Sequence, residues 1–60
     1  MTIQRAFTEA VNKGWKPIRV WLSPSYYKPE IRQIYGIPVQ LDNMLRISRV
    51  VCENGEVIYI

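Results

Sequence analysis

The chain lacks the residues from which most small catalytic and metal sites are built. It has no histidine and a single cysteine, Cys52, among its 60 residues. One cysteine excludes an internal disulfide, and a zinc site of the usual nitrogen and sulfur ligands needs more donors than the chain offers. Neither of the common glycine-rich phosphate-binding motifs occurs. We therefore expect neither a metal nor a cofactor.

Catalytic groups are equally scarce. Ser23, Ser25 and Ser48 have no histidine to activate them, which leaves a serine–lysine pair as an alternative that no motif supports. The acidic residues are accounted for by helix surfaces and turns. Cys52 is either a reactive thiol exposed near a cation or a buried structural thiol, and we favour the second interpretation. We expect a protein that is not an enzyme.

Long apolar runs and blocks of like charge are missing too. No stretch approaches the ~20 apolar residues that cross a bilayer, and the N-terminus lacks the apolar region of a secretory signal. Eight basic and five acidic residues give a net charge of +3 without a basic run. An unpaired cysteine agrees with a reducing compartment. These absences predict a cytoplasmic protein with no membrane contact.

What the chain does contain is enough apolar surface for one core. Hydrophobic residues make up 48% of it, including two tryptophans and four tyrosines. A chain of this size forms one domain, residues 1–60, of marginal stability. Such domains are usually stabilised by a disulfide, a metal or a partner. Since the first two are excluded, we expect either very good packing, a constitutive protein partner or self-association.

An amphipathic helix is predicted from Thr2 to Lys13. Its apolar residues recur at the three-and-four spacing of one helical face. Thr2 is a suitable N-cap, and Gly14 stands where a left-handed residue ends a helix. The residues expected on the buried face are Ile3, Ala6, Phe7, Ala10 and Val11.

A strand and a second helix are predicted next. Residues 16–22 alternate as a strand with one buried face, formed by Ile18, Val20 and Leu22. The second helix spans Pro29 to Tyr35, because proline fits a first helical turn, and Gly36 is its stop signal.

Three further strands complete the prediction. They span residues 37–41, 45–52 and 57–60, with Leu45 and Ile47 of the middle strand facing the core. Pro38 removes a ladder donor, so its strand is either short or at an edge. The pair Asn54-Gly55 favours a type I′ hairpin between the last two strands.

These elements predict an α/β (α+β) fold of the two-layer sandwich type. The order is α-β-α-β-β-β, and both helices cover one face of a small mixed sheet that ends in a β-hairpin. The second helix serves as the crossover between two parallel strands.

The opposite sheet face is the main candidate for a binding surface. The predicted alternation leaves Arg19, Trp21 and Arg46 together on it, where no part of the chain remains to cover them. Tryptophan and arginine are frequent anchors of protein interfaces. Arginine with aromatic rings also suits single-stranded nucleic acid. The alternative to both is that Trp21 packs beneath arginine stems or the chain termini.

A second cluster of aromatic residues lies near the helix boundaries. Tyr26 and Tyr27 are expected in the entry turn of the second helix, and Trp15 follows the first helix. Aromatic residues in loops often bind partners, and in a small domain they as often cap the core. We include both tyrosines among the expected partner-binding residues.

One segment resembles part of a known protein family. A Ser-Pro start followed by a G-x-P-V strand and a turn occurs at residues 22–24 and 35–44, which read LSP and YGIPVQLDNM. This stretch resembles part of the tailed-phage major capsid proteins. It covers less than half of the chain, and a capsid subunit is several times longer. The resemblance identifies no family and implies an origin in a phage or mobile element.

The sequence therefore predicts a protein–protein interaction module that binds a protein partner or itself. A small basic nucleic-acid-binding domain that uses the Arg/Trp sheet face is the alternative. Salt separates the two, because phosphate neutralisation makes affinity fall steeply as salt is added.

Overall fold

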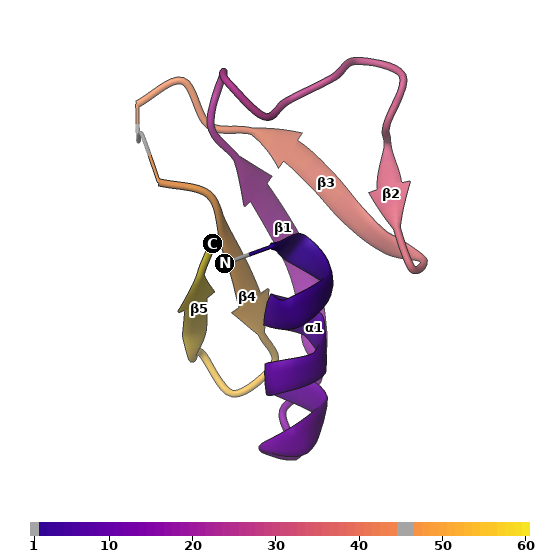
Figure 1. The fold of residues 1–60 in the computed structure, drawn as a ribbon, viewed down its shortest axis with the longest axis vertical. Coiled ribbons are helices and arrows are strands. Elements are labelled where there is room, and N and C mark those ends of the chain that lie inside the picture. Colours follow the sequence, from indigo (N-terminus) through magenta and orange to yellow (C-terminus); the bar gives the residue numbers. More distant parts are fainter. Residues whose placement is uncertain (1, 45–46) are drawn as a thin grey trace.

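The computed structural model describes residues 2–44 and 47–60, which form one helix and one mixed sheet. The strands lie in the order β2-β3-β1-β4-β5, with β1 and β3 parallel and the other neighbours antiparallel. The helix lies across β1 and β4 (Figure 1). The elements are α1 (Ile3–Asn12), β1 (Pro17–Leu22), β2 (Gln33–Ile34), β3 (Ile37–Leu41), β4 (Arg49–Cys52) and β5 (Val57–Tyr59).

Helix α1 forms as predicted. The Thr2 side chain accepts a hydrogen bond from the Arg5 N–H at 3.2 Å, which satisfies one free amide of the first turn. Gly14, at φ 76°, follows the last helical turn in the left-handed conformation. One residue of the predicted buried face is wrong, since Val11 is 67% exposed.

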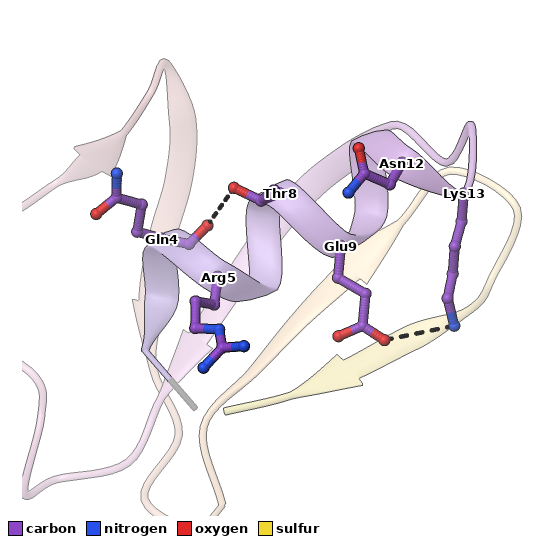
Figure 2. A pocket seen from close by; sticks show the side chains of 6 residues that line it. All are labelled: Gln4, Arg5, Thr8, Glu9, Asn12 and Lys13. Atoms are coloured by element: carbon purple, nitrogen blue, oxygen red, sulfur yellow. Dashed lines mark hydrogen bonds and ion pairs between the residues drawn. The ribbon is translucent and has the colours of Figure 1, made fainter.

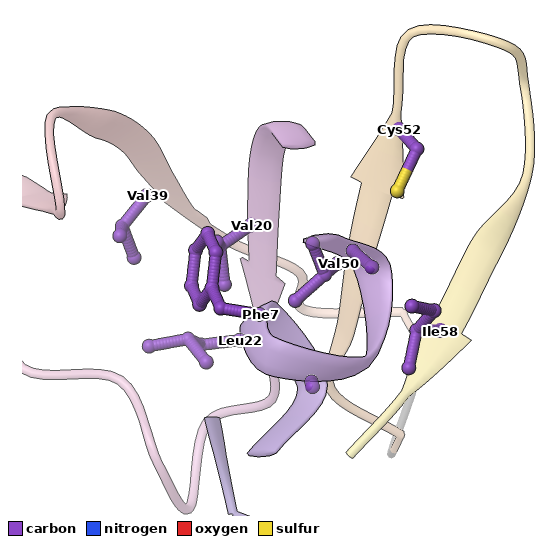
Figure 3. Packing of buried hydrophobic residues seen from close by; sticks show 9 residues of the cluster. Phe7, Val20, Leu22, Val39, Val50, Cys52 and Ile58 are labelled. Atoms are coloured by element: carbon purple, nitrogen blue, oxygen red, sulfur yellow. The ribbon is translucent and has the colours of Figure 1, made fainter. Parts of the chain in front are cut away.

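The core lies between α1 and the sheet. Its side chains come from four strands and from α1, and the Phe7 ring lies on the side of Val20, Leu22 and Val39 (Figure 3). The buried set is Ala6, Phe7, Ala10, Val20, Leu22, Val39, Val50, Cys52 and Ile58.

The predicted second helix is wrong. Residues 23–36 contain turns and the short strand β2, so the element order is α-β-β-β-β-β and a single helix covers the sheet. The predicted helix offered only seven residues, whereas isolated helices shorter than about 12–15 residues are marginal. The connection between the parallel strands β1 and β3 is therefore irregular rather than helical.

A tight hairpin takes the place of the expected helix end. Ile34 of β2 pairs with Ile37 of β3, and the two residues between them have positive φ, 52° at Tyr35 and 76° at Gly36. Positive φ at both central positions is the signature of a type I′ turn. Gly36 therefore belongs to a hairpin turn, and the pairing places both isoleucines against the core.

Strand β4 is shorter than predicted and faces the other way. It begins at Arg49, and Val50 pairs directly with Val20, which places Val50 and Cys52 in the core. Ile47, predicted to point inward, is 55% exposed, and Leu45 lies outside the described residues. The predicted phase would also have turned Arg49 toward the core, where an unpaired charge is very unfavourable.

The start of β1 differs from the prediction as well. The register changes between Pro17 and Arg19, which pair with consecutive residues of β4, so Ile18 is the additional residue of a β-bulge. The bulge interrupts the alternation of the strand. Ile18, predicted to face the core, is consequently 44% exposed.

The terminal hairpin is confirmed, but its turn type is not. The Gly55 N–H bonds the Cys52 carbonyl at 3.0 Å, and the Cys52 N–H bonds the Glu56 carbonyl at 2.8 Å. Gly55 has φ 86°, whereas Asn54 is absent from the positive-φ residues. This is a three-residue loop with one left-handed glycine, the second commonest hairpin connection.

Candidate functional site

The face of the sheet opposite α1 carries a row of large polar side chains. Directly paired residues share a face, and the register aligns Gln40 with Trp21, Trp21 with Arg49, and Arg49 with Tyr59. Arg19 stands two residues before Trp21 and so shares its face. We call Arg19, Trp21, Gln40, Arg49 and Tyr59 the arginine–tryptophan face.

Trp21 lies at the centre of this face, packed against two cations. The guanidinium carbon of Arg49 is 5.5 Å from the indole centroid, and that of Arg19 is 5.8 Å away. Both distances allow a cation–π interaction, which holds the indole in one orientation. Trp21 is half-buried under these arginine stems, which is the packing expected by the alternative in which Trp21 is not a binding residue.

Arg49 is fixed by a carboxylate. Its Nη1 lies 3.0 Å from Oδ2 of Asp42, and the two side chains are only 17% and 11% exposed. Asp42, immediately after β3, is itself held by a bond from its N–H to the Leu22 carbonyl and by the Met44 N–H, which donates to Oδ1. The pair therefore neutralises one of the two arginines and sets its position beside Trp21.

Arg19 is more open than Arg49. Its Nη1 donates to Oε1 of Gln40 at 3.2 Å, and the residue is exposed. In the described ranges 2–44 and 47–60, the ion pairs are Glu9–Lys13 and Asp42–Arg49, so Arg19 joins neither. The positive charge that this face offers to another molecule is that of Arg19.

The structure brings together two of the five predicted partner-binding residues, Arg19 and Trp21. Arg46 lies outside the described residues, and Arg49 stands beside Trp21 on the face where Arg46 was expected. Sequence reasoning missed Arg49 because it gave β4 the wrong phase. The sequence did contain a signal for the correct phase of β4, because only one of the two phases keeps the charged Arg49 side chain out of the core.

The other two predicted residues belong to the turn after β1. The N–H groups of Tyr26 and Tyr27 bond the Ser23 carbonyl at 2.9 and 3.0 Å, so the chain turns sharply there. Tyr26 is 60% exposed, and Tyr27 is half-buried against the core. Among ring contacts of the described chain, none joins either tyrosine to Trp21.

The three serines, far apart in the sequence, meet at the end of β1. The Ser23 N–H donates to Ser48 Oγ at 3.0 Å, and the Ser48 hydroxyl donates to Ser23 Oγ at 3.3 Å. The Ser23 and Ser25 hydroxyls are also 3.3 Å apart. Ser23 and Ser48 are 1% exposed, so this cluster joins the exit of β1 to the entry of β4 and satisfies buried polar groups.

Cys52 is a buried thiol, as favoured from the sequence. It is 1% exposed within the core between β4 and α1. Burial, and to a smaller extent the negative charge of Glu56, raise the pKa of the Cys52 thiol above its ordinary value of 9.0. The thiol is therefore protonated at neutral pH and a poor nucleophile.

The surface hollows do not gather reactive groups. One of them, about 470 Å³, lies along the outer side of α1 and is lined by residues of that helix and its C-cap, Lys13 (Figure 2). Some of its polar groups interact with one another, Glu9 with Lys13 at 3.5 Å and the Thr8 hydroxyl with the Gln4 carbonyl at 3.0 Å. No three His, Cys, Asp or Glu side chains of residues 2–44 and 47–60 converge on a metal position.

A smaller apolar hollow lies where the second helix was expected. It measures about 320 Å³ and separates α1 from the β2–β3 turn. Its walls include Phe7 and Tyr35, whose rings meet edge to face with centroids 5.2 Å apart, and the exposed Val11. One helix leaves this side of the core partly uncovered.

Comparison with known proteins finds no relative of this chain. The chain matches no protein-family model, no curated protein and no solved structure. The phage or mobile-element origin implied by the capsid resemblance therefore stays a prediction. Within the described residues no helix is long and apolar enough to cross a membrane.

Proposed function

We propose that the protein is a non-enzymatic protein-interaction module that binds a protein partner through the arginine–tryptophan face. The observation that carries this proposal is the arrangement of Trp21 between two arginines on the sheet face opposite α1. An indole already held in place loses little conformational entropy on binding. Tryptophan and arginine at the centre of a contact also contribute most to interface affinity.

The geometry favours a protein over a nucleic acid as the partner. A nucleobase would have to stack on the indole, but both guanidinium groups lie within 6 Å of its centroid and compete for that surface. Among the described residues Asp42 pairs with Arg49, so Arg19 is the one arginine of this face outside an ion pair that could meet a phosphate backbone. A partner that places a carboxylate against Arg19 and apolar surface against Trp21 and Tyr59 fits better.

The binding test uses a tagged chain and one charge reversal. A protein captured by the wild type is purified, and its affinity is measured by calorimetry and by the change in tryptophan fluorescence. Arg19→Glu should weaken this binding by roughly tenfold or more, because an interfacial cation becomes an anion. Arg32→Glu reverses the same charge at an exposed position outside the face and should leave the affinity unchanged.

Circular dichroism must show that both variants remain folded. Equal affinity of wild type and Arg19→Glu for the captured protein would contradict the proposal. Binding to a single-stranded oligonucleotide that falls steeply between 50 and 200 mM salt would support the nucleic-acid alternative instead.

We also propose a cytoplasmic location. The support is Cys52, an unpaired thiol that is buried in the core and so does not depend on an oxidising compartment.

A further inference from the structure

Strand β5 forms one edge of the sheet and leaves backbone groups without a neighbouring strand. The Cys52 N–H bonds the Glu56 carbonyl, and the Ile60 N–H bonds the Ser48 carbonyl, both at 2.8 Å. In an antiparallel ladder every second residue bonds inward, so Ile58 also bonds toward β4. The N–H and carbonyl groups of Val57 and Tyr59 therefore point away from the sheet.

The two edges of the sheet differ in how they are protected. The β2 edge has only two residues, Gln33 and Ile34. So short an edge offers little backbone for pairing with another chain. The β5 edge runs Val57-Ile58-Tyr59, with neither a charge nor a proline, and high β-propensity throughout. An edge of this kind is a template for another strand.

We propose that β5 pairs with β5 of a second copy of this chain, in antiparallel orientation, and joins two sheets into one. The outward-pointing residues are placed symmetrically about Ile58, so the edge is its own complement. With Ile58 at the two-fold axis, Val57 of each copy exchanges both backbone hydrogen bonds with Tyr59 of the other. This pairing does not rest on the function proposed for the arginine–tryptophan face.

The charges of α1 near this edge are compatible with a two-fold pairing. The helix contacts β4 and β5, and the residues that it presents toward the β2–β3 turn carry no charge. Arg5, Glu9 and Lys13 project from the other side (Figure 2), in the order plus, minus, plus. A two-fold axis reverses this row in the second copy. The reversed row again carries both signs, so it does not present a block of like charge to the first copy.

The test is sedimentation equilibrium on the wild type and two variants of one residue. Val57→Pro removes an outward N–H from the first residue of an edge strand, where proline is tolerated, and breaks no bond to β4. Val57→Thr keeps the N–H and the β-branched shape. The wild type and Val57→Thr should sediment as dimers, and Val57→Pro should dissociate with a constant at least about tenfold higher.

Amide hydrogen exchange on the wild type gives a second readout that needs no variant. Protection of the Val57 and Tyr59 amides should rise with protein concentration, while Ile58 and Ile60 stay protected at every concentration. A monomer at all concentrations, a dimer that Val57→Pro leaves intact, or unprotected Val57 and Tyr59 amides would each overturn the proposal. Neither experiment involves Arg19 or a captured protein, so failure here leaves the proposed function standing.

Discussion

At the residue scale, burial governs the chemistry of Cys52. Its raised pKa means that the folded state favours the protonated thiol. The resulting stability is fully present below pH 9.0 and is lost as pH rises through the higher pKa of the folded state.

Urea unfolding of the wild type should therefore show a stability that is level at neutral pH and declines above about pH 9. Cys52→Ala should decline less, because it removes the thiol whose deprotonation the folded state disfavours. Equal alkaline slopes in the two proteins, or rapid alkylation of native Cys52 at neutral pH, would contradict the buried-thiol assignment.

Gly55 has a conformational role that a substitution can isolate. A Cβ at this position meets no atom within 4 Å, so any loss of stability comes from the positive φ of 86°. Gly55→Val should lower the free energy of unfolding by about 1–2 kcal/mol, since a β-branched residue disfavours that region.

The same loop supplies the control. Asn54→Ala removes only the bond from the Glu56 N–H to the Asn54 side chain, 3.0 Å long and exposed. Because that bond is exposed, the loss of stability should be about 0.5 kcal/mol or less, smaller than that of Gly55→Val. A thermal melt that Gly55→Val leaves unchanged would show that the loop does not hold its left-handed glycine.

At the scale of elements, α1 depends on one side chain. Phe7 is 7% exposed and contacts the core from the centre of the helix (Figure 3). Phe7→Ala should cost about 3–5 kcal/mol. The whole domain, at roughly 0.05–0.15 kcal/mol per residue, has a stability of similar size, so the variant should not fold.

Val11→Ala is the matched control on the same helix. Val11 is 67% exposed, so its truncation should change stability by less than about 0.5 kcal/mol. Chemical denaturation followed by circular dichroism compares the two variants. If Phe7→Ala unfolds cooperatively at the same denaturant concentration as the wild type, Phe7 does not belong to the core.

At the scale of the whole molecule, one helix on a five-stranded sheet explains where the candidate surfaces lie. The sheet face opposite α1 is left to Trp21 and the arginines, and the β2–β3 side of the helical layer keeps an apolar hollow. Residues 2–44 and 47–60 form no further helix or strand that covers either region. A chain this small therefore presents a large share of its hydrophobic residues to potential partners.

Local patterns were sufficient for the elements that depend on neighbours in sequence. The spacing of apolar residues and the Thr2 cap predicted α1, and alternation predicted β1 and β3. The mixed sheet and the terminal hairpin also follow from the order of strands and the glycine between the last two. Arg19 and Trp21 could be placed on one face because β1 alternates regularly from Arg19 onward.

Only the tertiary structure decided the remaining features, because each depends on contacts distant in sequence. Residues 29–36 carry signals for a short helix and for a hairpin, and packing of Ile34 and Ile37 on the core selected the hairpin. Both faces of strand β4 carry aliphatic residues, so alternation alone does not show which face is buried. The pairing of Val50 with Val20 of β1 determines it. That choice placed Arg49 beside Trp21 and, with it, the composition of the candidate site.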